Sequence, residues 1–306
     1  MQRVYPNYYK DFKCVAGKCK HNCCIGWEID IDAKTYEYYK TVGGEIGNRL
    51  AESIENGDAP HFLLGNDGRC PFLNKDNLCD LIIELGEEHI CDICTAHPRF
   101  FNELPGRVEA GVGLTCEAAA RLILFNAEKA TLCNAPETSD EIIILRDKAI
   151  EVLQNREKSI EERVCEMLSL ADAHIPEKNM SEWAELLLSL ERLDEEWTSY
   201  LEKLLQEADF CRFDEYMKQR QTEYEQLLVY FVYRHVANAA SESDFADRIA
   251  FAAFAYKVIK AIGAAIYTEN GDFGMEKQAE LCRMFSSEIE YSDENLYILF
   301  DAMSEA

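Results

Sequence analysis

The sequence predicts a mainly α protein with two parts. A metal-binding module of cysteine-rich loops and short strands is expected in residues 1–135, and an α-helical bundle in residues 136–306. Ten of the 13 cysteines lie within the first 133 residues, where Gly and Pro separate short elements. After residue 140, apolar residues recur at helical spacing. The segment Asn134–Asp140, which contains Pro136, separates the two compositions and predicts the boundary.

The cysteine-rich part is expected to contain two helices and a Gly-rich strand. Asp32 belongs to the residue types that cap helices, and it predicts a helix over about residues 33–55. Residues 106–113 are rich in Gly and predict a short strand. Thr115 is expected to cap the next helix, which contains residues 117–124.

A β-hairpin is predicted between two cysteines of this part. The segment Cys70–Cys79 reads Cys-Pro-Phe-Leu-Asn-Lys-Asp-Asn-Leu-Cys, and Asn74–Asn77 is its expected turn. Because a turn of this kind pairs the strands on either side of it, the open ends meet. We therefore expect Cys70 and Cys79 to lie close together.

The bundle is predicted to begin at a helix that Ser139 or Asp140 caps. Four apolar stripes at helical spacing follow: Ile142, Leu145, Ala149 and Leu153; Trp183, Leu186, Leu187 and Leu190; Leu227, Phe231, Val232 and His235; and Phe251, Phe254, Val258 and Ile259. Stripes of this kind face the core of a helical bundle. We expect them to provide packing and no chemistry.

Composition excludes several classes of function and location. The formal net charge of -26 argues against nucleic-acid binding, which depends on basic groups meeting phosphates. The first residues lack the basic and apolar runs of a signal peptide. The longest apolar stretch, residues 249–266, contains Lys257 and Lys260 and is better interpreted as a buried helix than as a membrane span. We expect a cytoplasmic protein, in which thiols stay reduced and disulfides are absent.

Three interpretations of the cysteines compete. A structural zinc site is usually made of two short-spaced pairs, but Cys91-Asp-Ile-Cys94 is the one pair with two-residue spacing, and adjacent Cys23 and Cys24 seldom reach one small ion together. An iron–sulfur cluster takes thiolates from scattered loops, and irregular spacing suits it better. Free cysteines are also often small buried hydrophobic residues. This last interpretation is expected for Cys91, Cys133, Cys165, Cys211 and Cys282.

Several well-known cofactor motifs are absent from the sequence. A radical S-adenosylmethionine motif would continue from Cys19 and Cys23 to a cysteine at position 26, which is Gly26. No Gly-x-Gly-x-x-Gly, Gly-x-Ser-x-Gly or His-Glu-x-x-His motif occurs. His21 lies within the first group of cysteines and His97 follows Cys94, so each is a minor candidate for a metal ligand.

An ordered series of cysteines and their neighbours extends along nearly the whole chain. It consists of Tyr5-Pro6, Tyr8, Phe12, Cys14, Cys19, Cys23-Cys24, Trp27 and Ile29, of Cys70-Pro-Phe-Leu, Leu78-Cys79, Glu84-Leu-Gly-Glu87 and Cys94-x3-Pro98-Arg99, and of Leu114-Thr-Cys116-x3-Ala120-Arg121-Leu, Phe285-Ser-Ser-Glu-Ile-Glu290 and Glu294-Asn-Leu. This series resembles the flagellin lysine-N-methylase family. Its first third is also similar to a broader group of zinc- or iron-chelating cysteine domains.

This resemblance implies an enzyme that transfers methyl groups from S-adenosylmethionine to lysine side chains of flagellin, its protein partner. It also implies a [4Fe-4S] cluster, with zinc as the alternative metal. The metal ligands that it implies are Cys14, Cys19, Cys23, Cys24, Cys70, Cys79, Cys94 and Cys116. Eight thiols exceed the needs of one cubane, so either some of them are structural or two centres exist.

The catalytic residues are not specified by a motif. A lysine amine must lose its proton before it attacks a sulfonium methyl, and aromatic faces can hold the cation beforehand. Tyr5, Tyr8, Trp27 and Glu28 are weak candidates because they lie near the first cysteines in sequence. The alternative function is a non-enzymatic iron–sulfur or zinc protein that acts as a redox sensor or an interaction module.

Overall fold

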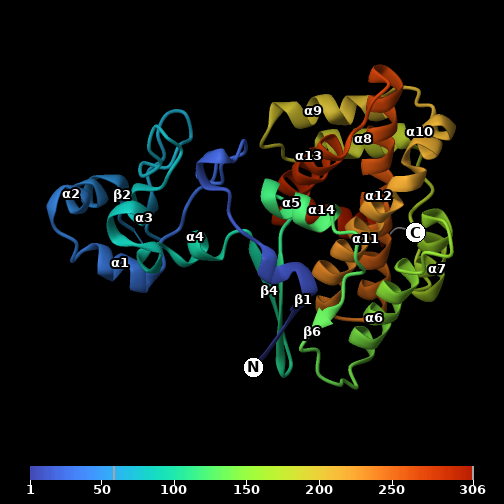
Figure 1. The fold of residues 1–306 in the computed structure, drawn as a ribbon, viewed down its shortest axis with the longest axis horizontal. Helices are drawn as coiled ribbons and strands as arrows, with labels where there is room; N and C mark the ends of the chain where they lie inside the picture. Colours follow the sequence, from blue (N-terminus) through green and yellow to red (C-terminus); the bar gives the residue numbers. More distant parts are fainter. Residues whose placement is uncertain (58, 305–306) are drawn as a thin grey trace. The chain divides into compact units, whose positions relative to one another are not determined.

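The computed structural model describes residues 1–57 and 59–304 and divides the chain into two compact units. Unit 1 contains Met1–Phe12 and Phe100–Ala306, and unit 2 contains Lys13–Arg99 (Figure 1). Unit 2 is thus an insertion into unit 1. Helices dominate the chain, as the sequence predicts. The domain boundary at residues 135 and 136 stays a prediction.

A small mixed sheet in unit 1 joins the first strand of the chain to strands far along the sequence. Its order is β4-β5-β1-β6, and its strands are β1 (Gln2–Pro6), β4 (Arg99–Leu104), β5 (Arg107–Val112) and β6 (Leu132–Cys133). β1 runs parallel to β5, with Gln2 opposite Arg107, and antiparallel to β6. β5 confirms the strand predicted in residues 106–113. The strand β1 had no signal in the sequence.

The helical bundle of unit 1 follows the predicted apolar stripes. Its helices are α5 (Glu117–Leu124), α6 (Glu141–Leu153), α7 (Ile160–Leu170), α8 (Met180–Ser189), α9 (Glu195–Glu202), α10 (Phe210–Met217), α11 (Gln221–His235), α12 (Glu242–Asn270), α13 (Met275–Phe285) and α14 (Asp293–Met303). Asp140 caps α6, because its side chain accepts a hydrogen bond from the Ile143 amide at 3.1 Å. One of the two predicted caps is therefore confirmed.

Helix α12 forms the centre of the bundle. It is long and apolar enough by composition to cross a membrane, but 89% of its most apolar 18-residue window is buried inside the fold. It packs against α11, α14 and α7 (Figure 1). Phe251, Phe254 and Ile259 are buried within its packed faces. α12 therefore acts as the core helix that the sequence predicted for residues 249–266.

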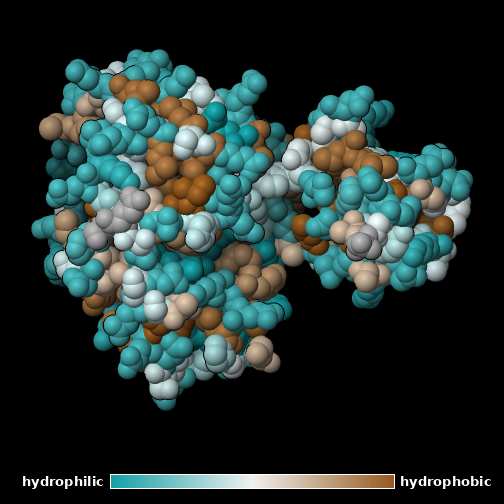
Figure 2. Space-filling model, turned by 180° about the vertical axis from the view of Figure 1, so that it is seen from behind, coloured by the Kyte–Doolittle hydropathy of each residue, from teal (hydrophilic) through white to brown (hydrophobic). Residues whose placement is uncertain are grey.

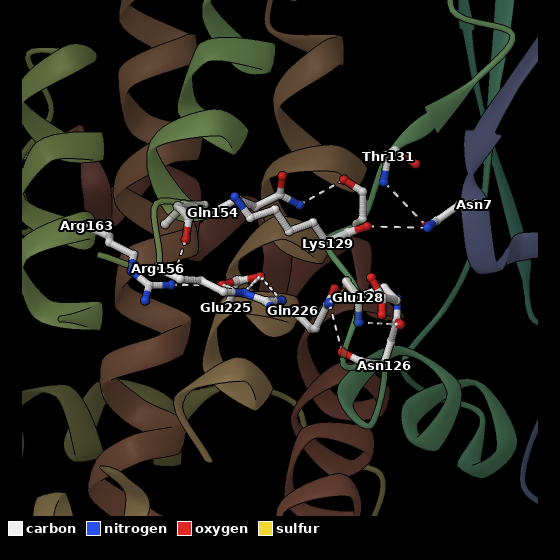
Figure 3. A network of polar contacts seen from close by, with 12 residues as sticks. Asn7, Asn126, Glu128, Lys129, Thr131, Gln154, Arg156, Arg163, Glu225 and Gln226 are labelled. Atoms are coloured by element: carbon white, nitrogen blue, oxygen red, sulfur yellow. Dashed lines mark hydrogen bonds and ion pairs between the residues drawn. The ribbon is translucent and has the colours of Figure 1, made fainter. Parts of the chain in front are cut away.

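A buried ion-pair network fixes the connection between α5 and β6 (Figure 3). The Glu225 carboxylate on α11 is buried and accepts hydrogen bonds from Arg156 at 2.8 Å and from Arg163 at 2.9 Å. Its neighbour Gln226 donates to the carbonyls of Asn126 and Glu128. The side chain amides and guanidinium groups thus satisfy backbone carbonyls and a carboxylate that lie away from water.

Unit 2 consists of short helices joined by loops. Its elements are α1 (Ala33–Tyr39), α2 (Gly44–Ser53), β2 (Ile54–Glu55), β3 (His61–Phe62), α3 (Asp80–Leu85) and α4 (Asp92–Ala96). Asp32 caps α1 as predicted, since its side chain accepts from the Thr35 amide. The single helix predicted over residues 33–55 is wrong. The chain turns at Gly43 and Gly44, and Gly44 adopts a φ of +75° that a right-handed helix excludes.

The core of unit 2 is small and includes sulfur atoms. Ile29, Tyr39, Leu50 and Phe62 pack in it together with the buried side chains of Cys70 and Cys91, and with other apolar residues. Exposed apolar side chains also occur on this unit, and they are Val15, Leu63, Leu78, Ile82, Ile83 and Ile93. Figure 2 shows patches of hydrophobic residues among hydrophilic ones on the smaller unit.

Candidate metal centre and buried polar network

Backbone pairing places three cysteines of unit 2 beside one another. The Cys70 amide donates to the Cys24 carbonyl at 2.8 Å. Leu73 and Cys79 form an antiparallel bridge around the turn Asn74–Asn77, in which Asn77 has a φ of +56°. The predicted turn is therefore confirmed, although the pairing is one bridge rather than two strands.

A second pair of cysteines flanks the start of α4. Cys91 is the residue before the helix, and Cys94 lies within it. The Asp32 carboxylate accepts from the Asp92 amide at 3.0 Å and so ties α4 to the cap of α1. Cys91 is fully buried, and its sulfur lies 3.8 Å from the Tyr39 hydroxyl. Its expected role as a plain core residue stays a prediction, because a thiol in this position also faces other thiols.

Six thiols of unit 2 interact with one another through hydrogen bonds or charge. We call them the thiol cluster: Cys23, Cys24, Cys70, Cys79, Cys91 and Cys94. A hydrogen bond between Cys23 and Cys24 lowers the pKa of Cys23 to about 7 and raises that of Cys24. A hydrogen bond between Cys91 and Cys94 likewise lowers the pKa of Cys91 and raises that of Cys94.

Burial and mutual repulsion govern the other members of the thiol cluster. Burial raises the pKa of Cys70 to about 11, and the charges of Cys79 and Cys91 add to this effect. Burial also raises the pKa of Cys79. Thiols that raise one another's pKa resist ionisation together unless a cation compensates them. Among residues 1–57 and 59–304, however, no three or more His, Cys, Asp or Glu form a group that would hold a metal ion as placed.

Three of the eight cysteines expected as ligands lie outside the thiol cluster. Cys14 is exposed and its sulfur accepts from the Ala16 amide at 3.3 Å. Cys19 is half-buried and donates to the His21 carbonyl at 3.2 Å. Cys116 belongs to unit 1, where it precedes α5. The set of eight metal ligands stays a prediction. The thiol cluster also contains Cys91, which was not among those eight cysteines.

The weak catalytic candidates are divided between the units. Tyr5 and Tyr8 are buried in unit 1, and burial raises the pKa of Tyr8. Trp27 is half-buried and Glu28 is exposed, and both belong to unit 2. The catalytic role of these four residues stays a prediction. Burial lowers the pKa of His97, which is half-buried near Cys94 in the sequence.

A buried polar network in unit 1 surrounds a π-helix at Ser286–Glu290. The Glu290 carboxylate is fully buried and accepts from His235 Nε2 at 2.6 Å and from the Tyr230 hydroxyl at 3.1 Å. Arg234 Nε lies 3.3 Å from the same carboxylate and its Nη1 donates to the Tyr230 hydroxyl at 2.7 Å. We call Tyr230, Arg234, His235 and Glu290 the polar network.

Charge assignments in the polar network follow from its contacts. Burial alone would raise the pKa of Glu290, but Arg234 and His235 outweigh this effect and lower it. Burial lowers the pKa of His235 despite the neighbouring carboxylate. Glu290 and Arg234 are thus the ion pair, and neutral His235 donates its Nε2 proton to Glu290.

The π-helix also contacts the segment before α5. The hydroxyls of Thr115 and Ser287 lie 2.7 Å apart, and both side chains are buried. The Leu114 amide donates to the Tyr230 hydroxyl at 3.2 Å. The prediction that Thr115 caps α5 is therefore wrong by one residue. Cys116 occupies the cap position, and the Thr115 hydroxyl is engaged with Ser287 instead.

Glu288 binds a distant turn of the bundle. Its carboxylate accepts from the backbone amides of Leu193 and Asp194 at 2.8 and 3.0 Å, just before α9. Burial raises its pKa against the effect of these donors. The π-helix and polar network were missed as a site by the sequence reasoning. Their signal in the sequence is the run of polar residues Ser286, Ser287, Glu288 and Glu290 directly after α13. π-Helices are frequent at functional sites.

Comparisons with known proteins agree with the sequence motifs. The family described as "FliB lysine N-methylase C-terminal domain" matches residues 169–306, which include the π-helix. The flagellar biosynthetic protein FliU of Salmonella muenchen is 24% identical over 148 residues, which are 46% of this chain and 88% of that protein. No solved structure matches the fold.

Two lysine-N-methylases are also similar to this chain. Those of Salmonella choleraesuis (strain SC-B67) and Salmonella typhimurium (strain LT2) are each 25% identical over 134 residues, which are 42% of this chain. The matched part is 33% of either lysine-N-methylase, so the chain spans about a third of their length. These matches agree with the resemblance found in the motifs: residues 169–306 of this chain are similar to the FliB lysine N-methylase C-terminal domain.

Proposed function

We propose that this chain transfers methyl groups from S-adenosylmethionine to lysine side chains of flagellin. The observation that carries the proposal is the match of residues 169–306 to the FliB lysine N-methylase C-terminal domain. The structure supports it through contacts between two segments of the resemblance. Leu114 and Thr115 bind Tyr230 and Ser287 of the buried polar site, so motifs far apart in sequence contribute to one place in unit 1.

The chemistry requires a neutral amine and its alignment with the methyl group. Lysine has an ordinary pKa of about 10.4, so the protein must favour loss of the proton by desolvation or by a nearby base. Alignment of nitrogen, carbon and sulfur is a positioning task, for which rigid buried side chains are suited. The ion pair of Glu290 with Arg234 and the bonds of Tyr230 provide such rigidity.

For unit 2 we propose a [4Fe-4S] cluster, with Cys24, Cys70, Cys79 and Cys94 as its ligands and Cys91 as a hydrogen-bonding neighbour. The donor set supports the cluster because several half-buried thiols of unit 2 interact with one another. Each ligand of a cubane binds a different iron, so thiolates from separate loops suit it.

A bound cluster would supply an iron site for the amino and carboxylate groups of S-adenosylmethionine, and it would also stabilise a small unit with a limited core. Cys14, Cys19 and Cys23 remain proposed as additional ligands only if a second centre exists. The metal content decides between these arrangements, because two cubanes would double the iron bound per chain.

The test is anaerobic purification followed by iron, sulfide and zinc analysis, a visible spectrum and a methylation assay. We expect a brown protein with about four irons that transfers labelled methyl groups to flagellin. Flagellin in which the modified lysines are changed to arginine should accept no label. A protein that binds a metal but methylates no lysine would support the alternative, a non-enzymatic sensor or interaction module, and would overturn the proposal.

A further inference from the structure

Three aromatic rings and a carboxylate surround one cation in unit 1. The Arg234 guanidinium carbon lies 4.8 Å from the ring centre of Tyr291, 5.0 Å from that of Phe100 and 5.9 Å from that of Tyr230. Its Nε lies 3.3 Å from the Glu290 carboxylate. We call these three rings with Glu290 the cage. The faces of aromatic rings carry negative potential, and several rings around one cation form the usual pocket for alkylammonium groups.

A nearby arginine shows how the cage differs from an ordinary contact. Arg248 lies 4.8 Å from the ring centre of Phe300 and pairs with Asp244 at 2.7 Å, on the surface of α12. It therefore has one ring and one carboxylate, as many structural arginines do. Arg234 has three rings and a carboxylate that is fully buried. The additional rings are more than an ion pair needs to be stable.

Two walls of the cage, Phe100 and Tyr230, have contacts besides Arg234. The ring of Phe100 packs on the backbone of Gly111, where a Cβ atom would lie 2.2 Å from the ring. The Tyr230 hydroxyl is fixed by the Leu114 amide and Glu290. Tyr230 and Phe100 also meet edge to face, with ring centres 6.3 Å apart. A side chain that leaves the centre of the cage would thus leave rings in place.

The cage is close to the surface. The side chain of Arg234 is 12% exposed, whereas that of Glu290 is fully buried beneath it. Phe100 and Tyr291 are half-buried. An incoming cation would therefore meet the rings first and the carboxylate last. Arg234 stands on the last turn of α11, and its side chain has a long stem with several rotatable bonds.

We propose that the cage is the recognition site for the alkylammonium group of a lysine side chain, and that Arg234 occupies it while no substrate is bound. This inference rests on the proposed function, because a lysine methylase binds cations of this class as substrate and product. Ring faces accept an ammonium with or without methyl groups, since they do not depend on N–H donors. A cage of this kind is suited to lysine at successive stages of methylation.

The test uses the full chain with Arg234→Ala, which empties the cage, and tetramethylammonium chloride as the probe. Thermal unfolding is measured with the probe, with sodium chloride at the same concentration, and with 3,3-dimethyl-1-butanol as the uncharged counterpart. We expect tetramethylammonium to raise the Tm of Arg234→Ala and the other two solutes to leave it unchanged. Arg248→Ala, which removes a cation from a single ring, should show no such increase.

Removal of a ring tests the geometry of the cage. In Arg234→Ala, a second change of Tyr291→Leu should weaken tetramethylammonium binding by about two- to fivefold, while Tyr291→Phe should preserve it. Equal responses of the Arg234 and Arg248 variants, or equal binding by the Leu and Phe variants, would overturn the proposal. If Arg234→Ala does not fold, Arg234→Gln is used, since its shorter amide still reaches toward the Tyr230 hydroxyl and leaves the rings uncovered.

Methylation assays separate this proposal from the function on which it rests. In the otherwise unaltered chain, Tyr291→Leu should raise the KM for a lysine substrate more than it lowers kcat, and Tyr291→Phe should change neither. Probe binding without any methyl transfer would leave the cage established and reject the proposed function. Methyl transfer with a KM that Tyr291→Leu does not change would reject the cage and leave the function intact.

Discussion

The hydroxyl groups of Thr115 and Ser287 lie 2.7 Å apart, although the two residues are 172 positions apart in the chain. This hydrogen bond joins the segment before α5 to the π-helix. Arg283 Nη1 donates to the same Ser287 hydroxyl at 3.3 Å. The Ser287 hydroxyl thus connects the π-helix to the start of α5, and one oxygen atom makes both hydrogen bonds.

Ser287→Ala should destabilise unit 1 by about 1–3 kcal/mol, because the buried Thr115 hydroxyl and an Arg283 N–H would each lose a partner. Urea unfolding measures the difference. Ser189→Ala is the matched control, since the Ser189 hydroxyl is exposed and donates to the Leu186 carbonyl, and its loss should cost less than about 0.5 kcal/mol. Equal effects of the two changes would contradict the importance of the contact.

Glu290→Gln should destabilise the protein by about 3–5 kcal/mol, because it leaves the Arg234 cation partly buried without a countercharge. Calorimetry or urea unfolding gives the value. The comparison is Glu276→Gln on the surface: Glu276 pairs with Arg121 at 2.7 Å but is 65% exposed, so its loss should cost about 1 kcal/mol or less. A small effect at Glu290 would mean that Arg234 leaves the interior readily.

Stability should fall on acidification below about pH 6.5, before carboxylates titrate. Burial lowers the pKa of folded His235 below its ordinary value of 6.5, so the unfolded chain binds the proton more readily. The stability that neutral His235 contributes is present above pH 6.5 and is lost as the pH falls toward the pKa of His235 in the folded protein. His235→Gln should reduce the slope of unfolding free energy between pH 6.5 and 5 by up to about 1.4 kcal/mol per pH unit.

Below the ordinary carboxylate range, Glu290 should become the dominant group of the polar network. Its folded pKa is lowered from 4.5, so its stabilising effect is present above pH 4.5 and disappears as the pH falls through the folded value. Wild-type protein should therefore lose further stability there, and Glu290→Gln should lose less. Unfolding free energies at pH 3 to 5 compare the two proteins.

Gly44→Ala should destabilise unit 2 by about 1–2 kcal/mol, because Gly44 has a φ of +75°. Gly43→Ala is a close control: Gly43 has a φ of -101°, and a Cβ atom at either glycine would meet nothing within 4 Å. We expect the control to be neutral or slightly stabilising. Limited proteolysis and thermal unfolding of both variants would measure the difference, and equal destabilisation would contradict a strain confined to Gly44.

Cys70→Ser should remove the proposed cluster, with loss of visible absorbance and of about four irons per chain. Cys91→Ser should retain iron but shift the spectrum, since we propose Cys91 as a neighbour that hydrogen-bonds rather than a ligand. Cys211→Ser changes an exposed thiol of unit 1 and should have no effect on the metal. Iron analysis after anaerobic purification decides among these outcomes, and full metal content in Cys70→Ser would contradict the assignment.

Local signals in the sequence predicted the elements that depend on local chemistry. Asp32 and Asp140 cap helices because their side chains reach amides three residues ahead, and Asn74–Asn77 forms a turn for similar reasons. The length of the helix after Asp32 could not be predicted in this way. Its end depends on a backbone angle at Gly44 that an apolar pattern does not report.

The features that the sequence did not predict depend on contacts between distant segments. No residue near Thr115 in the sequence indicates a contact with Ser287. The Thr115 hydroxyl, which would suit a helix cap, is hydrogen-bonded to Ser287 instead. The grouping of Cys91 with other thiols likewise follows from the tertiary position of α4, which Asp32 holds. Tyr8 and Trp27 are close in sequence but belong to different units, and their catalytic role stays a prediction.

Strand β1 has a consequence for the order in which a ribosome completes this protein. Gln2 pairs with Arg107, and Tyr5 pairs with Cys133, so the first strand has no partner until more than a hundred further residues have been made. All of Lys13–Arg99 emerges in that interval. The thiol-bearing insertion is thus synthesised before the sheet formed by β1, β5 and β6 can close.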